Sequence, residues 1–246
     1  MVRRCWVGAA LAVLVMFAFS ADPIVDRFFR MPGEVWAQSL AKFASRWCDF
    51  PPMLVVAISF LGLASVRRWR VAQRICVAVL LSGVLTGLVG LAVRCLTGRT
   101  RPCALVEQGW YGPWHAGHWI VGVHDLNSFP SGHTIFAASM AFVPVFAVGS
   151  RARAFGLIPV LVAWSRLCLG KHHLSDVVVA LCLGFIGAWV HWNHTLPLLE
   201  RWSGWWRTLS AGAEIPVAKA GGGGPTEDVL CMAAPLGAAP CQTPTE

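Results

Sequence analysis

Long apolar stretches alternate with short polar connections along this chain. A helix needs roughly 20 mainly apolar residues to cross a bilayer, within a range of about 17–25. Six stretches approach or reach that length, and they cover residues 5–21, 52–66, 75–93, 134–148, 154–169 and 177–192. The second, fourth and fifth reach it only with their flanking Ser, Gly and aromatic residues, so five spans are the alternative to six. The pattern predicts an all-α, polytopic membrane helix bundle with about six transmembrane helices.

The first stretch has a second interpretation. Arg3 and Arg4 precede it, and Ala18-Phe19-Ser20 near its end resembles the small-residue cleavage site of a secretory signal. We expect a retained helix, with a signal peptide as the alternative. In either case the next loop lies on the outer face.

Two further segments have their own patterns. Between the first two stretches, apolar residues recur near helical spacing, which predicts an amphipathic helix lying in the interface or a connector packed on the bundle. These residues are Val35, Trp36, Leu40, Phe43 and Trp47. Residues 207–246 are rich in Gly and Pro and predict a disordered cytoplasmic tail behind a membrane domain at 1–206.

Composition excludes a soluble domain. Hydrophobic residues make up 56% of the 246 and charged residues only 13%, whereas soluble domains carry about 25% charged residues.

The net charge of +8 does not indicate a nucleic-acid partner, because the basic residues gather in every second loop. They are Arg3, Arg4, Arg67, Arg68, Arg70, Arg74, Arg151, Arg153, Arg201, Arg207 and Lys219. Cytoplasmic loops carry such an excess of Lys and Arg, so we expect both termini in the cytoplasm.

The loop at 94–130 breaks this rule. It is predicted to lie on the outer side, yet it carries Arg94, Arg99 and Arg101. Arginines on that side of a membrane favour an anionic ligand. The same loop holds Cys95 and Cys103, which could pair in an oxidising compartment.

Three short segments at the predicted outer ends of the spans carry candidate chemistry. They are Arg94-Cys-Leu-Thr-Gly-Arg-Thr-Arg101-Pro102, then Pro130-Ser131-Gly132-His133, then Ser165-Arg166 followed by His172 and Asp176.

Arg94, Arg101 and Arg166 offer permanently charged planar forks of donors that suit phosphate oxygens. Ser131 adds a hydroxyl donor, and Gly132 lets the backbone approach a ligand closely. We interpret residues 127–133 as a helix start capped by Asn127 or Ser128. A helix N-terminus binds anions readily.

His172 and Asp176 are four residues apart and are neighbours on one helix face. A carboxylate bonded to one imidazole nitrogen leaves the other free to attack. His133 is the candidate general acid for the leaving group. Lys171 and His173, beside the nucleophile, are expected to be solvated or to face lipid headgroups.

Together these segments closely resemble the signature of the type 2 phosphatidic acid phosphatase (PAP2) superfamily, which includes vanadium haloperoxidases. That signature is Lys-x6-Arg-Pro, Pro-Ser-Gly-His, then Ser-Arg-x5-His-x3-Asp, and this chain departs from it only in having Arg94 for the leading Lys.

The resemblance implies a PAP2/haloperoxidase-like core and a reaction without metal or other cofactor, through a phosphohistidine on His172. His133 would protonate the leaving group, and Asp176 would orient His172. Five residues would hold the phosphate: Arg94, Arg101, Ser131, Gly132 and Arg166.

The sequence therefore predicts a lipid phosphate phosphatase in a bacterial inner membrane, with its site facing the periplasm. Its partners would be membrane lipids and a phosphorylated lipid substrate, with no nucleic acid. The alternatives are a phosphotransferase that uses the same site, a vanadium-dependent haloperoxidase, and a non-catalytic scaffold or transporter.

Overall fold

The computed structural model describes residues 2–30 and 34–203. The described part is mainly helical. Its long helices are α1 (Val2–Arg30), α2 (Val35–Trp47), α3 (Phe50–Val66), α4 (Arg70–Thr97), α5 (Gly132–Val148), α6 (Leu157–Cys168), α7 (Leu174–Val190) and α8 (Leu196–Ser203). The tail predicted at 207–246, and the last residues of the domain predicted at 1–206, lie outside the described residues.

Short elements join these helices. The 3-10 helix η2 (Gly149–Gly156) connects α5 to α6, and the π-helical turn η3 (His191–Thr195) connects α7 to α8. The long α4–α5 connection contains a small antiparallel hairpin of β1 (Trp114–His115) and β2 (His118–Trp119), followed by the 3-10 helix η1 (His124–Leu126).

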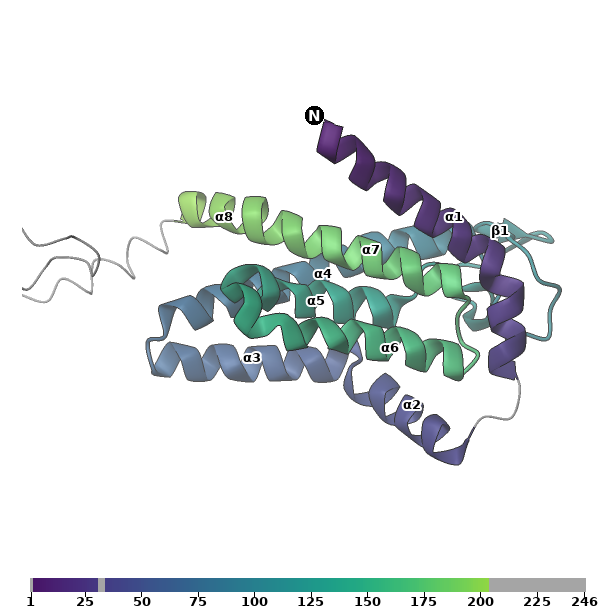
Figure 1. The fold of residues 1–246 in the computed structure, drawn as a ribbon, viewed down its shortest axis with the longest axis horizontal. Helices are drawn as coiled ribbons and strands as arrows, with labels where there is room; N and C mark the ends of the chain where they lie inside the picture. Colours follow the sequence, from purple (N-terminus) through teal and green to yellow (C-terminus); the bar gives the residue numbers. More distant parts are fainter. Residues whose placement is uncertain (1, 31–33, 204–246) are drawn as a thin grey trace, which may run out of the picture. The chain divides into compact units, whose positions relative to one another are not determined.

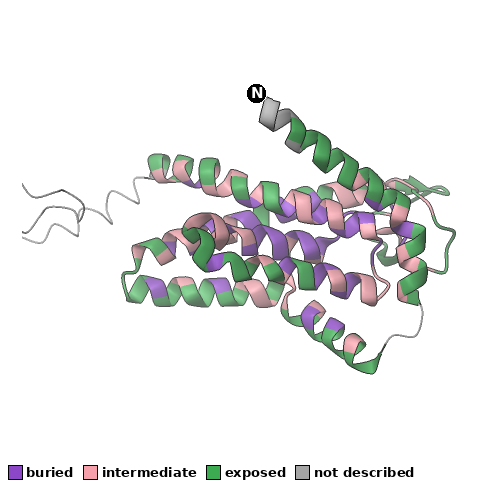
Figure 2. Ribbon diagram, viewed as in Figure 1, coloured by how far each residue is buried: buried purple, intermediate pink, exposed green. Residues whose placement is uncertain are grey.

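Helix α5 forms the centre of the bundle and packs against α4, α6 and α7 (Figure 1). Its buried positions are mostly small, including Ala137, Ala138, Ser139 and Ala141. Buried residues concentrate on α5 and on the facing sides of its neighbours, whereas the outer sides of α1 and α3 are exposed (Figure 2). The exposed side chains on these outer sides are largely apolar, as expected of helices that face lipid.

The prediction of about six spans is confirmed in outline. By length and composition, four helical stretches of the described residues can cross a membrane, or five if the bent pair α2–α3 counts as one. One of the four is the continuous stretch Gly132–Cys168, in which α6 runs back beside α5 after η2 (Figure 1). If α5 and α6 are counted as two spans and the bent pair α2–α3 as one, the total is the predicted six.

Gly184 on α7 lets that helix approach the backbone of α5. A methyl group on Gly184 would lie 2.9 Å from the Ser139 nitrogen and 3.0 Å from the Ile135 oxygen, and would clash with the Ala138 side chain. Because these atoms belong to a packed helix, they cannot move aside independently.

We expect Gly184→Ala to destabilise the protein, since overpacking a core costs about 1–3 kcal/mol. Gly62→Ala on α3 is the matched control, because a methyl group there meets nothing within 4 Å and alanine favours a helix by roughly 0.5–1 kcal/mol. Thermal unfolding in detergent should give a lower midpoint for Gly184→Ala than for wild type, and no decrease for Gly62→Ala. Equal midpoints for the two variants would contradict this account of the packing.

The predicted helix between the first two spans is present as α2. Its small residues Ala41 and Ala44 are buried, and α2 lies against α6. Trp36 and Phe43 are exposed. The helix therefore combines the two expected features, with one face packed on the bundle and an apolar face that is open. It meets α3 at an angle of 53°.

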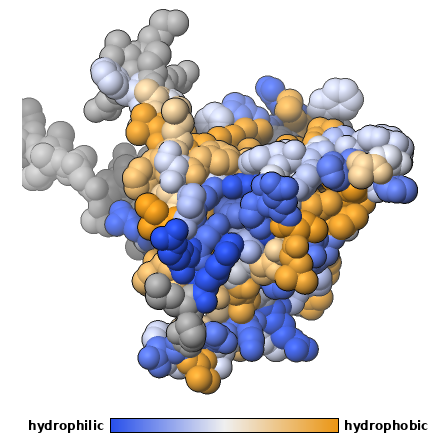
Figure 3. All heavy atoms as spheres, turned by 90° about the vertical axis from the view of Figure 1, so that its right-hand side faces the viewer, coloured by the Kyte–Doolittle hydropathy of each residue, from blue (hydrophilic) through white to orange (hydrophobic). Residues whose placement is uncertain are grey.

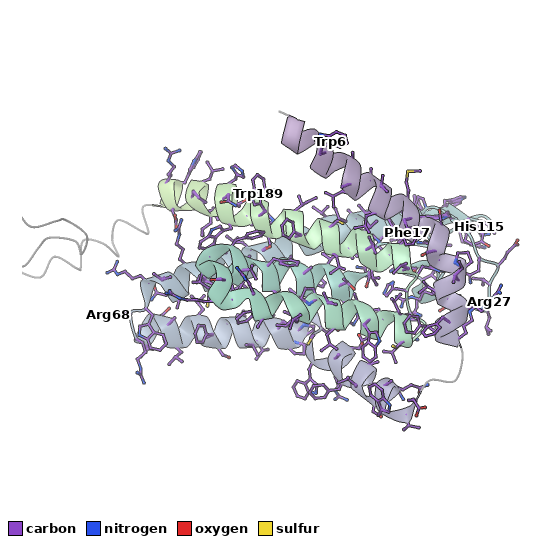
Figure 4. All side chains as sticks on the ribbon, in the orientation of Figure 1. Trp6, Phe17, Arg27, Arg68, His115 and Trp189 are labelled. Carbon is purple, nitrogen blue, oxygen red and sulfur yellow. The ribbon has the colours of Figure 1, made fainter. Side chains whose placement is uncertain are left out.

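One end of the bundle collects the α4–α5 connection, the α6–α7 turn, α2 and the C-terminal half of α1 (Figure 1). Seen from that end, hydrophilic side chains gather on this face and apolar ones flank them (Figure 3). Arg27 and His115 lie at this end and Arg68 at the opposite one, with Trp6 and Trp189 along the apolar length between them (Figure 4). Cys95 and Cys103 are both free thiols, so the disulfide considered from the sequence is not formed.

Candidate active site

The three predicted segments meet at this end of the bundle. The loop before α5 is fixed to α4, because the Thr97 hydroxyl donates to the Phe129 carbonyl oxygen at 2.9 Å. It is also fixed to α7, because the Ser131 amide donates to the Asp176 carbonyl oxygen at 3.2 Å. Residues from four helix ends are thereby brought around one small region.

His172 is buried in the turn between α6 and α7, with 2% of its surface exposed. Its Nδ1 lies 2.8 Å from the Ser128 carbonyl oxygen and 3.6 Å from the Asp176 carboxylate. The carbonyl is the nearer acceptor and can accept a hydrogen bond only from a protonated Nδ1, so the lone pair of the neutral ring is on Nε2.

Electrostatics also favour a neutral His172. Burial lowers the pKa of His172 to about 3, and the charges of Arg166 and Arg101 act in the same direction against the opposing effect of Asp176. At neutral pH the ring therefore keeps a free nitrogen lone pair.

The geometry refines the prediction that Asp176 orients His172. Asp176 is fully buried and accepts the Ser128 hydroxyl at 2.5 Å and the His173 amide at 2.9 Å. Ser128 in turn supplies the carbonyl that faces His172. Asp176 therefore holds Ser128, the residue whose carbonyl oxygen accepts the hydrogen bond from His172. The sequence analysis did not assign this role to Ser128.

Arg99 is an additional residue of this network. Its guanidinium donates to the Asp176 carboxylate at 2.5 Å and to Asp22 of α1 at 2.7 Å. It also stacks over the rings of Phe19 and Trp110, at 5.3 and 4.7 Å. Because its charge is neutralised by two buried carboxylates, Arg99 is not available to an anion in the way the loop pattern suggested.

Two of the three predicted phosphate-binding arginines, Arg101 and Arg166, donate hydrogen bonds to described residues. Arg101 donates to the backbone oxygens of His124 at 2.7 Å and of Asn127 and Lys171 at 3.4 Å. Arg166 donates to the Ser45 hydroxyl at 2.5 Å.

The Nε atoms of Arg94 and Arg166 are buried and have no hydrogen-bond partner among the described residues. A buried charged donor without a partner costs free energy, so these two groups favour binding of a ligand that accepts hydrogen bonds.

The start of α5 differs in detail from the prediction. The capping position is Ser131 rather than Asn127 or Ser128, because Ser128 is engaged with Asp176 and the helix begins at Gly132. Ser131 is buried, with its hydroxyl 3.0 Å from that of Thr134. Gly132 lies against Arg94, and a methyl group there would come within 2.9 Å of the central guanidinium carbon.

We expect Gly132→Ala to push the Arg94 guanidinium aside while leaving the fold intact, because a flexible side-chain end yields more easily than a helix. Affinity for orthovanadate, measured by calorimetry, should fall about tenfold, as expected for loss of one charge-assisted hydrogen bond. The unfolding midpoint should be unchanged. Unaltered vanadate affinity would contradict the interpretation that Gly132 leaves the space in which the Arg94 guanidinium lies.

His133, the predicted general acid, faces a carboxylate that sequence reasoning did not assign. Its Nε2 lies 3.2 Å from the Oδ2 of Asp49, at the corner between α2 and α3. Both side chains are partly exposed, at 29% and 35%. His133 is therefore accessible from solvent, unlike His172.

His173 is buried rather than solvated, which corrects the expectation from the sequence. Its two ring nitrogens lie 2.6 Å from the Asp26 carboxylate and 3.1 Å from the Thr100 carbonyl oxygen. Burial lowers the pKa of His173, but its hydrogen bond to Asp26 and the negative charges of Asp176 and Asp26 together outweigh burial, so the pKa is raised. His173 thus fixes α1 to the α4–α5 connection.

The residues that the sequence analysis missed share one property. Asp22, Asp26 and Asp49 are acidic, and the sequence analysis assigned none of them to the site. They contact Arg99, His173 and His133, respectively. Three acidic residues close to predicted membrane spans were the signal in the sequence that could have pointed to these contacts.

Comparison with known proteins gives matches of three kinds. The family model described as the PAP2 superfamily matches residues 72–197, more than half of the chain. Among curated proteins, phosphatidylglycerophosphatase B of Escherichia coli is 42% identical over 64 residues, which cover 24% of this chain and a quarter of that relative's length. Putative undecaprenyl-diphosphatase YbjG of Escherichia coli is 29% identical over 194 residues, covering 75% of this chain and 87% of the relative.

Among solved structures, LpxE of Aquifex aeolicus superposes with a TM-score of 0.50 at 20% identity, covering 70% of this chain and 95% of that one. This likeness concerns the fold.

Proposed function

Because this chain belongs to the PAP2 superfamily, we propose that it is a membrane phosphatase that hydrolyses a phosphomonoester or a pyrophosphate of a lipid. Two observations carry the proposal: the buried guanidinium Nε atoms of Arg94 and Arg166 have no partner among the described residues, and Arg166 acts on a buried, neutral His172. An oxyanion supplies the acceptors that these donors lack, and a tetrahedral phosphate can present oxygens to both.

In the proposed reaction, Nε2 of His172 attacks phosphorus while its Nδ1–H remains hydrogen-bonded to the Ser128 carbonyl. The phosphorus–oxygen bond to the lipid breaks, and His133 gives its proton to the departing oxygen. Arg94, Arg101 and Arg166 stabilise charge on the equatorial oxygens as the transition state forms.

The second half regenerates the enzyme. A water molecule attacks the phosphohistidine and transfers a proton to His133, which has become a base. The phosphorus–nitrogen bond breaks, inorganic phosphate leaves, and His172 is neutral again. The scheme uses only side chains of the protein and a water molecule, so we propose that the reaction needs no added metal.

The proposed substrate is a lipid because the site lies at one end of a bundle of apolar helices. Phosphatidic acid, phosphatidylglycerol phosphate, undecaprenyl pyrophosphate and lipid A phosphate each combine an anionic phosphate with an apolar body. We further propose that this end faces the periplasm, with both termini in the cytoplasm, as the distribution of basic loops indicates.

A panel of these four lipids, presented to purified protein in detergent, tests the proposal through release of inorganic phosphate. We expect hydrolysis of at least one lipid, no loss with EDTA, and inhibition by orthovanadate, which resembles the pentacoordinate transition state. Activity abolished by EDTA and restored by a divalent cation would contradict the proposed mechanism. Transfer of phosphate to a second lipid without release would instead identify a phosphotransferase.

A further inference from the structure

The corner between α2 and α3 forms a wall of the candidate site that none of the three predicted segments contributes. Two of its side chains reach predicted site residues. Ser45 accepts a hydrogen bond from Arg166 at 2.5 Å, and Asp49 lies 3.2 Å from Nε2 of His133.

Asp49 is held in place from two sides. Its Oδ1 accepts the amide of Phe50 at 2.8 Å at the start of α3, which leaves Oδ2 to face His133. The next residue, Phe50, stacks on Phe136 of α5 with ring centroids 4.3 Å apart. Since Phe136 lies one helical turn after His133, this stacking fixes the start of α3 beside the start of α5.

The charges around His133 come from three elements. Arg94 of α4 lies against the adjacent Gly132, and Arg166 of α6 contributes positive charge near Asp49. Among the described residues, the carboxylate that contacts His133 is Asp49. Asp49 therefore places a negative charge beside His133, on the side of the site where Arg166 contributes a positive charge.

We propose that Asp49 is the positioning residue of the general acid. It accepts the Nε2–H of His133, which fixes the ring and leaves Nδ1 to carry the transferred proton. In the first half-reaction, the Nδ1 proton passes to the lipid oxygen as the phosphorus–oxygen bond breaks. In the second, Nδ1 takes a proton from the attacking water. Asp49 keeps its negative charge throughout, and this assignment rests on the proposed function.

The test uses the full-length protein with two phosphate esters that carry the same alkyl tail, one with an alkyl and one with a nitrophenyl leaving group. A nitrophenolate departs without protonation, whereas an alkoxide needs an acid. We expect Asp49→Asn to lower kcat about 10–100-fold for the alkyl ester, within the range of general acid catalysis. For the nitrophenyl ester, the decrease should stay below about twofold. Asparagine keeps the helix-capping capacity at residue 49, so α3 should still form.

Two comparisons separate positioning from a purely structural role. In a His133→Ala background, Asp49→Asn should cause no further loss, because residues that act as a unit are not additive. Glu200→Gln removes a carboxylate that pairs with Arg74 at 2.8 Å near the start of α4 and should leave both rates unchanged.

Equal losses on the two esters, or an additional loss in the His133→Ala background, would overturn the assignment. If Asp49→Asn should fail to fold, Asp49→Ser, which also caps a helix, provides the same comparison. Failure of the wild type to release phosphate from any ester would instead refute the proposed function, so the two failures are distinguishable.

Discussion

Replacing His172 with alanine is expected to abolish phosphate release, with a decrease of about a thousandfold or more, as for removal of other covalent nucleophiles. Of the two predicted catalytic histidines, His172 is the buried one, and its neutral state and Nδ1 hydrogen bond leave Nε2 available.

The measurement is inorganic phosphate released from the best lipid, together with trapping of labelled phosphoenzyme by an acid-free quench. Wild type should give a phosphoramidate that is stable to base and labile to acid, and His172→Ala should give none. His115→Ala is the matched control, because His115 is an exposed histidine of the β1–β2 hairpin at the same end of the bundle (Figure 4). Substantial turnover by His172→Ala would refute the nucleophile assignment.

The second large effect is expected for Arg166→Ala. Loss of one preorganised donor to a developing oxyanion typically costs about 10²–10³ in rate. Arg166 is buried, its Nε has no partner among the described residues, and its Nη1 is held by Ser45. We therefore expect kcat/KM to fall by that amount, and Arg166→Lys to recover only part of it, because an ammonium lacks the planar fork.

The unfolding midpoint provides a check on this interpretation. Removing a buried charge whose donor is unpaired should not destabilise the protein strongly. Arg68→Ala, at the opposite end of the bundle, should retain full activity (Figure 4). If Arg166→Ala lost activity only in proportion to a lower midpoint, Arg166 would be a structural residue and not an anion ligand.

The helices could be predicted from the sequence because an apolar stretch that crosses a bilayer must satisfy its backbone hydrogen bonds internally, and an α-helix does so. The segments around Arg94, His133 and His172 could also be predicted, because each is a short local pattern of residues with distinctive chemistry. Their convergence at one end of the bundle follows from alternating spans, which place every second connection on the same side.

The remaining part of the site could not be predicted, because its contacts join distant positions. Asp22 reaches Arg99 across 77 positions, and Asp26 reaches His173 across 147. Neither pair has a local signature. The prediction of the residue that caps α5 was wrong for a related reason. Asn127 and Ser128 are both good capping residues by type, but Ser128 is bonded to Asp176, which is distant in the sequence.

The contact between α1 and α7 constrains how the molecule can be made. Asp22 accepts the backbone amide and the hydroxyl of Ser175, a residue 153 positions later. Until α7 has been synthesised, Asp22 therefore lacks the Ser175 partner and has only Arg99 of its folded-state partners available. Contacts between such distant positions close late, because the intervening chain must first be ordered. A nascent chain that stops before α7 has no Ser175 for this carboxylate, so the contact between α1 and α7 forms only after the intervening helices have been made.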